Sequence, residues 1–276
     1  MKKRLLFMDL DGTLLNDEKQ ITDGNRAALN RLLERGHGAI ITTGRPLKSA
    51  MDQARKLGMD RPGCYLIAYN GAVIYDWAQQ KQIFARSLSY SAVNRVVDLA
   101  NEWGEHVQTY DTRNVLVEKR CDDEAVCRYC QMIGMEFRVI EDVHTDLREE
   151  PVKCLVINYA DKSGLLKIQS WIHENMAQEV DCFFSCDQYL EVVPKGMSKG
   201  EAVKMLSAMM DVEIADAVAV GDAANDLSMI EAAGIGVAMA NGTEEVKAAA
   251  DYITTYDNNH DGIAEVVERF FSENAE

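Results

Sequence analysis

The feature that most constrains the fold is an alternation of short apolar runs with amphipathic stretches in the first part of the chain. Leu5–Leu10, Ala39–Thr42 and Tyr65–Tyr69 are apolar runs of strand length. Stretches with helical periodicity separate them, and helices are predicted over 23–35 and 46–57. A repeated strand–helix–strand order favours a parallel sheet with helices on both faces.

The same alternation returns near the C-terminal end of the sequence. Ala217–Val220 and Ile235–Met239 predict two further strands, and helices are predicted over 198–210 and 225–233. The intervening chain has a different texture, with short strands that alternate between apolar and polar residues, as expected for an α+β domain with a mixed or antiparallel sheet. We therefore predict an α/β core made of residues 1–83 and 191–276, interrupted by an α+β domain of residues 84–190.

The charge balance excludes several classes of partner. The 276 residues include 29 Lys and Arg against 45 Asp and Glu, which gives a formal net charge of −16. A chain this acidic is a poor match for proteins that neutralise phosphates of nucleic acid or bind an anionic membrane surface. We expect no nucleic-acid or membrane partner, and we expect a monomer or a homodimer.

The cysteines and the N-terminal residues indicate a cytoplasmic protein. Seven scattered cysteines are most simply read as reduced thiols, and the Cys127–Cys130 pair has no second pair that would complete a zinc site. The apolar run after Met1 is interrupted at Asp9 and Asp11, too early for a signal peptide.

Two carboxylates follow the first predicted strand directly. Asp9 and Asp11 lie where ligands bind in parallel sheets, beyond the carboxyl end of a strand. A Mg²⁺ ion can offset the repulsion between such carboxylates. A calcium-binding loop starting at Asp9 would need Gly at its sixth position and Glu at its twelfth, where the sequence has Leu14 and Gln20. The calcium-loop interpretation is therefore rejected.

Three further polar clusters occur at strand ends or helix starts. Thr43 and Gly44 precede a helix, and a hydroxyl, a Gly amide and a helix N-terminus together suit a phosphate group. Lys199 opens a helix that Ser198 is expected to cap. The segment from Gly221 to Asp226 follows a buried strand. Helix entry, surface exposure or capping explains each cluster alone, but the set of four indicates one site.

Taken together, these residues resemble the four motifs of the haloacid dehalogenase superfamily. The matching residues are Asp9, Asp11, Thr43, Gly44, Arg45, Lys199, Asp222, Asn225 and Asp226. More narrowly, the chain is similar to the Cof-type phosphatases of subclass IIB, and most closely to the YidA-type sugar phosphatases. The resemblance implies a Rossmann-like parallel-sheet core with an inserted α+β cap of the C2B type.

The resemblance also implies a Mg²⁺-dependent phosphatase of small phosphorylated metabolites, most plausibly sugar phosphates. Asp9 is expected to attack phosphorus and form an aspartyl-phosphate, and Asp11 to act as general acid and then general base. The expected Mg²⁺ ligands are the Asp9 carboxylate, the Asp11 backbone carbonyl and Asp222. Asp226 is expected to position Lys199 or a water bound to the metal, with Arg45 as a further supporting residue. The expected phosphate-binding groups belong to Leu10, Thr43, Gly44, Lys199 and Asn225.

Two alternative functions remain open from the sequence. A hexose phosphomutase on the same fold would retain its product for a second phosphoryl transfer, whereas a phosphatase would release inorganic phosphate. A non-catalytic sensor of phosphate or metal would use the same site for binding alone. The presence of both Asp9 and Asp11 argues against a sensor, because binding does not require a nucleophile together with a general acid.

Overall fold

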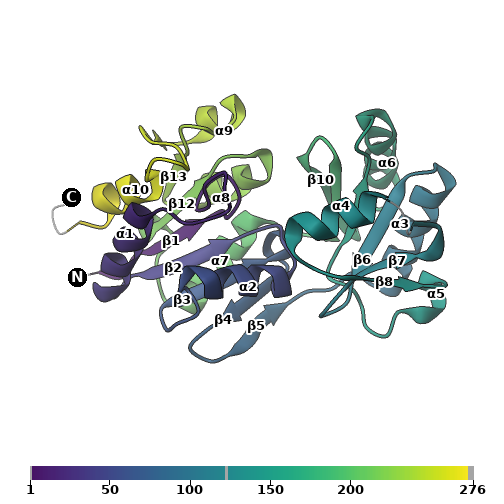
Figure 1. Cartoon of the computed structure of the whole chain (residues 1–276), viewed down its shortest axis with the longest axis horizontal. Coiled ribbons are helices and arrows are strands. Elements are labelled where there is room, and N and C mark those ends of the chain that lie inside the picture. Colours follow the sequence, from purple (N-terminus) through teal and green to yellow (C-terminus); the bar gives the residue numbers. More distant parts are fainter. Residues whose placement is uncertain (1, 122–123, 273–276) are drawn as a thin grey trace. The chain divides into compact units, whose positions relative to one another are not determined.

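The chain forms two compact units in a computed structural model that describes residues 2–121 and 124–272 (Figure 1). The first unit comprises the described residues up to 44, residues 50–84 and the described residues from 198 onward. The second unit comprises residues 45–49 and the described residues of 85–197. Residue 1 and residues 273–276, which belong to the predicted domains, lie outside the described part of the chain.

An eight-stranded sheet organises the first unit, in the order β14-β13-β12-β1-β2-β3-β4-β5. The pairs from β14 to β3 are parallel, and β4 returns antiparallel to β3. The strands are β1 (Leu5–Met8), β2 (Gly38–Thr42), β3 (Cys64–Ala68), β4 (Val73–Asp76), β5 (Lys81–Ala85), β12 (Ala217–Gly221), β13 (Ile235–Ala238) and β14 (Tyr252–Ile253).

Side chains cap two helices of this part of the chain. Ser198 caps α7 by accepting from Glu201 N, as predicted, and Thr22 caps α1 by accepting from Asn25 N. The helices are α1 (Asp23–Glu34), α2 (Leu47–Leu57), α7 (Lys199–Met209), α8 (Leu227–Ala232), α9 (Glu244–Ala249) and α10 (Gly262–Phe270). Helices α1 and α10, from opposite ends of the sequence, pack side by side (Figure 1).

The apolar core of this unit fixes helix α7 against the centre of the sheet. Strand β1 is completely buried between β12 and β2, as expected for a central parallel strand with an uninterrupted apolar run. Leu5 and Phe7 share one hydrophobic cluster with Val203 and Leu206 of α7. Because burying each such side chain stabilises the fold by roughly 1.5–3 kcal/mol, this cluster holds α7 firmly beside β1.

The second unit is built around a six-stranded sheet, in the order β10-β11-β9-β6-β7-β8. Its strand pairs are antiparallel except for the parallel pair β7 and β8. The strands are β6 (His106–Tyr110), β7 (Val115–Glu118), β8 (Phe137–Ile140), β9 (Cys154–Ile157), β10 (Val180–Cys186) and β11 (Tyr189–Pro194). The helices are α3 (Tyr90–Glu102), α4 (Glu124–Ile133), α5 (Val143–Asp146) and α6 (Lys162–Asn175).

The predicted fold class is confirmed: an α/β unit with a largely parallel sheet is interrupted in sequence by an α+β unit with a mixed sheet. Helices α3 and α6 pack on the sheet of the second unit. No helix in the described ranges combines the length and the apolar character needed to cross a lipid bilayer.

Candidate active site

The first site segment is a tight loop that continues from β1. The N–H of Asp9 donates to the Val220 carbonyl (3.0 Å), so the pairing between β1 and β12 extends into this loop. The N–H of Leu15 then donates to the Leu10 carbonyl (2.8 Å), which folds the loop back on itself. Asp9 and Leu10 are buried, whereas Asp11 is partly exposed. The loop therefore presents two carboxylates at the carboxyl end of the central strand.

Gly12 allows this loop to contact the segment after β12. Its φ is +85°, and a Cβ atom at this position would lie 2.5 Å from Oδ2 of Asp222. Glycine is therefore required both for the backbone conformation and for the close approach. The next residue, Thr13, is completely buried and donates from its hydroxyl to Oδ1 of Asp222 (2.6 Å). The two segments are thus joined by a short hydrogen bond.

Lys199 lies between two buried carboxylates. Its Nζ is 2.5 Å from Oδ1 of Asp9 and 2.6 Å from Oδ1 of Asp226, and only 1% of the residue is exposed. Burial alone would lower the pKa of Lys199, but Asp226 and Asp9 together raise it above its ordinary value. Lys199 therefore remains an ammonium ion at neutral pH and offsets part of the negative charge of the site.

Asp226 organises the site through both of its carboxylate oxygens. Oδ1 accepts from Lys199, and Oδ2 accepts from the backbone N–H groups of Asp222 and Ala223, each at 3.0 Å. These bonds hold Lys199 in place and fix the loop that carries Asp222. Asp226 is completely buried. Its geometry matches the positioning of Lys199 that the resemblance implies.

Three carboxylates come together in a group that could hold a metal ion. One oxygen each of Asp9, Asp222 and Asp226 lie within 4.8 Å of one another. Burial raises the pKa of Asp9 well above its ordinary value, against the opposing charge of Lys199, and burial raises the pKa of Asp222 to about 6, with a further contribution from Asp226. In the described part of the chain, these three carboxylates share a single ammonium group, that of Lys199. A hard divalent cation such as Mg²⁺, which prefers carboxylate oxygens, fits this donor set.

The side chain of Asp11 is not one of these three carboxylates. Its Oδ1 accepts from Nζ of Lys19 at 2.9 Å, and both side chains are partly exposed to solvent. The resemblance assigns the backbone carbonyl of Asp11, not its carboxylate, to the metal. Lys19 was not predicted from the sequence, because a lysine eight residues after a motif aspartate has no distinctive pattern.

The phosphate cradle predicted at Thr43 and Gly44 lies at the end of β2. Thr43 is buried, and its backbone N–H donates to the Ile67 carbonyl (2.9 Å). The turn after β3 contacts this cradle, because the N–H of Asn70 donates to the Thr43 carbonyl (3.1 Å). Nδ2 of Asn225 donates to Oδ1 of Asn70 (3.5 Å), so the segment from Gly221 to Asp226 also contacts this turn.

Arg45 is the one predicted site residue that belongs to the second unit. It is buried, and its guanidinium donates to the Ser49 hydroxyl (3.5 Å), which in turn donates to the Ile133 carbonyl (2.5 Å). Within the first unit the structure therefore brings together Asp9, Lys199, Asp222 and Asp226, and it links Thr43 to Asn225 through Asn70. Arg45 has its contacts within the second unit.

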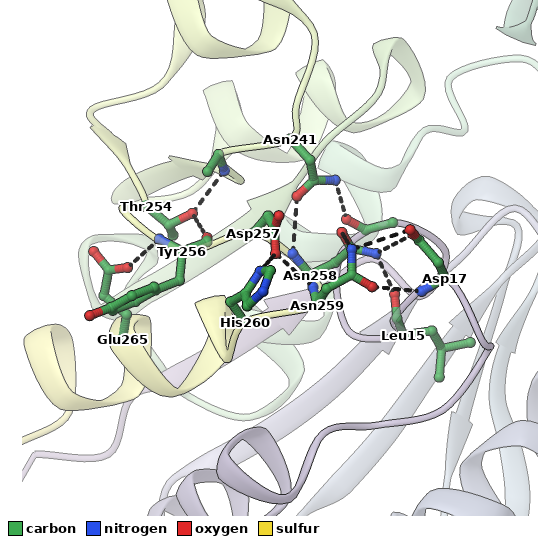
Figure 2. Close-up of polar contacts among 12 residues, drawn as sticks. Leu15, Asp17, Asn241, Thr254, Tyr256, Asp257, Asn258, Asn259, His260 and Glu265 are labelled. Carbon is green, nitrogen blue, oxygen red and sulfur yellow. Dashed lines mark hydrogen bonds and ion pairs between the residues drawn. The ribbon is translucent and has the colours of Figure 1, made fainter.

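A network of asparagines supports the loop that follows β1 (Figure 2). Asn241 donates from Nδ2 to the Gly12 carbonyl (2.8 Å), and Asn258 donates from Nδ2 to the Leu15 carbonyl (3.0 Å). The N–H of Asn258 also donates to Oδ1 of Asn241 (3.1 Å), which links the two braces. Asn258 is buried, so its loss would remove the side-chain donor to the Leu15 carbonyl. Neither asparagine was predicted from the sequence.

This network predicts unequal effects for two adjacent asparagines. Asn258→Ala is expected to lower the free energy of unfolding by about 1–3 kcal/mol, because a buried hydrogen-bonding group is removed. Asn259→Ala, which removes an exposed side chain that contacts Asp17, is expected to cost less than about 0.5 kcal/mol. Urea denaturation of both variants measures the difference. Equal losses would show that the buried contacts to Leu15 and Asp17 contribute no more than the exposed ones.

The sequence profile of the haloacid dehalogenase-like hydrolases matches residues 6–267. The chain belongs to this family. The prediction that it is a hydrolase of the haloacid dehalogenase type, acting on phosphoric monoesters, is confirmed at the level of the family and its phosphatase relatives.

Related proteins, including some whose structures have been solved, match this hydrolase over almost their whole length. It is 30% identical to the 5-amino-6-(5-phospho-D-ribitylamino)uracil phosphatase YitU of Bacillus subtilis, over 98% of each chain. It is 33% identical to a haloacid dehalogenase-like hydrolase from Bacteroides thetaiotaomicron, whose structure gives a TM-score of 0.87 and covers 97% of this chain and 99% of the other. A sugar phosphatase of subclass IIB shares the fold, with a TM-score of 0.82 at 23% identity, over 96% of this chain and 98% of the other.

Proposed function

We propose that this hydrolase is a Mg²⁺-dependent phosphatase of small phosphorylated metabolites, in particular sugar phosphates, and that it acts through an aspartyl-phosphate on Asp9. The observation that carries the proposal is the environment of Asp9, a buried carboxylate that contacts the Lys199 ammonium directly beside Asp222. A buried, oriented carboxylate at the end of a central strand suits a nucleophile.

The residues of the first unit divide the reaction between them. An oxygen of Asp9 would attack phosphorus, and Asp11 would give a proton to the departing alcohol oxygen. Asp11 would then take a proton from the water that hydrolyses the aspartyl-phosphate. Asp9, the Asp11 backbone carbonyl and Asp222 would hold Mg²⁺, and the ion when bound would offset the negative charge of the phosphoryl group.

The remaining motif residues would bind and orient the phosphoryl group. Lys199 would interact with phosphoryl oxygens while Asp226 holds it in position, as its two short contacts in the structure allow. Binding groups that are fixed before the substrate arrives lower the cost of reaching the transition state. We assign these groups to the Leu10 amide, the Thr43 hydroxyl, the Gly44 amide, Lys199 and Asn225, with Arg45 in a supporting role.

We also propose that residues 84–190 serve as a cap that excludes water and contacts the leaving group. The support is the topology, in which this part of the chain is inserted between β5 and α7. The relative YitU is named for a substrate that carries a phosphorylated ribityl chain, which supports a sugar-phosphate-like substrate here. A cytoplasmic location is supported by the seven cysteines, all of them described and free, and a monomer or homodimer remains our expectation.

A panel of phosphate esters tests this function against its alternatives. The purified protein is incubated with Mg²⁺ and p-nitrophenyl phosphate, hexose phosphates, pentose phosphates or sugar-alcohol phosphates, and both inorganic phosphate and isomerised sugar phosphates are measured. A phosphatase releases phosphate and loses activity when EDTA removes the metal. Isomerised product without free phosphate would indicate a phosphomutase, and tight phosphate binding without turnover would indicate a sensor.

The raised pKa of Asp222 predicts that Mg²⁺ binds less tightly in acid. Burial and the charge of Asp226 raise this pKa to about 6, so below pH 6 the metal must displace a proton from Asp222. The apparent Mg²⁺ dissociation constant is expected to rise by about tenfold per pH unit below 6 and to change little above pH 7. Calorimetric titration with Mg²⁺ at pH 5, 6, 7 and 8 measures this. Equal affinities at pH 5 and pH 7 would contradict the expectation.

A further inference from the structure

The turn that follows β3 has an unusual backbone. Tyr69, Asn70 and Gly71 all have positive φ values, of 52°, 53° and 106°. Side chains disfavour this region, so two consecutive non-glycine residues in it are energetically costly and persist only where the surroundings enforce them. Such conformations concentrate at functional sites. The turn is completely within the first unit.

Three segments of the candidate active site enforce this turn. The N–H of Asn70 donates to the carbonyl of Thr43. A Cβ atom on Gly71 would clash with the carbonyl oxygen of Ser198, so the turn packs directly on the residue that caps the helix of Lys199. The side chain of Asn70 accepts from Asn225. The turn therefore connects the motif at Thr43, the helix of Lys199 and the motif that contains Asn225.

The carboxamide of Asn70 lies beside the phosphate cradle. A Cβ atom on Gly44 would lie 2.9 Å from Oδ1 and 3.2 Å from Nδ2 of Asn70, so this carboxamide covers the Cα atom of Gly44. It thus lies between two residues to which we assign contacts with the phosphoryl group, Gly44 and Asn225.

The Nδ2 amide group of Asn70 donates no hydrogen bond within the described part of the chain. Asn70 is 1% exposed, and its Nδ2 has no hydrogen-bond partner among the described residues. A buried N–H₂ group without a partner is costly, and each such group in a native structure calls for a ligand or an explanation. The other end of the carboxamide is occupied, since Oδ1 accepts from Asn225. The free end has only donors, which suits an anion.

We propose that Asn70 is a further substrate-binding residue, whose Nδ2 donates a hydrogen bond to an oxygen of the phosphoryl group. This inference rests on the proposed function, because it assumes that the cradle at Thr43 and Gly44 holds phosphate. Asparagine suits the position for two reasons. It tolerates the left-handed backbone better than most residues, and its carboxamide supplies an acceptor for Asn225 and a donor for the anion.

Two substitutions at this residue separate binding from structure. Asn70→Asp keeps the shape, the tolerance of the backbone and the acceptor for Asn225, but it replaces the donor by a negative charge. Asn70→Gly keeps the backbone and removes the whole side chain. Asn30→Asp, at a position where Oδ1 accepts from Arg61 on the surface, adds the same charge elsewhere in the first unit and serves as the control.

The measurement is calorimetric binding of inorganic phosphate in the presence of Mg²⁺, together with Mg²⁺ binding and thermal unfolding of each variant. We expect Asn70→Gly to weaken phosphate binding by about tenfold to a hundredfold, as for the loss of one hydrogen bond to a charged group. Asn70→Asp should weaken it further through like-charge repulsion. Mg²⁺ affinity should change less than threefold in both variants, and Asn30→Asp should bind phosphate as the wild type does.

Phosphate affinity in Asn70→Asp equal to that of the wild type would overturn the inference. If Asn70→Asp does not fold, Asn70→Gly decides, because glycine imposes no strain at this backbone conformation. The proposed function fails separately, if the wild type releases no phosphate from any ester. Weakened phosphate binding in the Asn70 variants would support the inference even then.

Discussion

Asp9→Asn should abolish turnover while leaving the site otherwise intact. The amide has nearly the same shape as the carboxylate, but its oxygen is a poor nucleophile and cannot form the aspartyl-phosphate. We expect kcat for p-nitrophenyl phosphate with Mg²⁺ to fall by about 10⁴-fold or more, as for other removed nucleophiles. The Michaelis constant should change far less, because the groups we assign to phosphoryl binding, Lys199, Thr43 and Gly44, are unchanged.

A chemical readout accompanies the kinetic one. Wild-type protein quenched in acid during turnover should carry a phosphoryl group on the peptide that contains Asp9, and mass spectrometry should find none on the variant. Asp23→Asn, which removes an exposed carboxylate at the start of α1, is the matched control and should keep full activity. Turnover of the Asp9 variant within tenfold of the wild type would disprove the nucleophile assignment.

Lys199→Met should cause a larger loss of stability than Asn258→Ala or Asp9→Asn. Methionine fills a similar volume but leaves two buried carboxylates, those of Asp9 and Asp226, without their shared ammonium partner. Removing one partner of a buried ion pair typically costs about 3–5 kcal/mol, because an uncompensated charge remains. Urea denaturation at pH 7 without added metal measures the loss, and phosphatase activity should disappear as well.

The direction in which the stability of Lys199→Met changes with pH gives a second test of the ion pair between Lys199 and Asp9. Burial raises the pKa of Asp9 in the folded protein. Without the ammonium group, the folded variant therefore binds protons more readily than the unfolded chain does, and its stability should increase as the pH falls from 7 to 5. The double variant Lys199→Met/Asp226→Asn removes one of the two charges and should regain part of the lost stability without regaining activity. A double variant no more stable than the single one would contradict the electrostatic explanation.

The parallel core and the meeting of its motifs could be predicted because both follow from local patterns. An apolar run such as Leu5–Leu10 identifies a buried strand, and parallel strands place their carboxyl ends at one edge of the sheet. Motif residues directly after such strands must then lie near one another, whatever the intervening chain does. Asp9 and Asp222 are an example, since β1 and β12 are neighbours in the sheet although they are far apart in sequence.

Two strands of the second unit, β6 and β11, were not predicted from the sequence, and for β6 the reason is physical. Strand β6 carries His106, Gln108 and Thr109, which read as exposed polar residues, yet all three are buried. They are tolerated inside because they find partners there: Gln108 donates to the Tyr110 hydroxyl (2.9 Å), and Thr109 donates to the Lys153 carbonyl (2.9 Å). Strand β11, which lies between β10 and β9, was not predicted either.

The contacts of the residues that support the site could not be derived from sequence patterns. Asn258 and Asn70 act through contacts with loops that are distant in the chain, and Asn70 does so from a backbone conformation that only the surrounding segments enforce. No spacing rule relates Asn70 to Asn225, so only the folded chain brings their side chains together.

The arrangement of β1 between β2 and β12 also has a consequence for the order in which the protein is made. During synthesis, β1 emerges early but must wait for residues 217–221 before its second neighbour exists. Pairing between strands so far apart in sequence is slow, because a long loop must close first. Until then one edge of an apolar strand stays open to other chains. The continuous stretch 85–197 has all of its strands by that time. Asp9 and Asp222, which follow these two neighbouring strands, can therefore come together only after residues 217–221 have been synthesised.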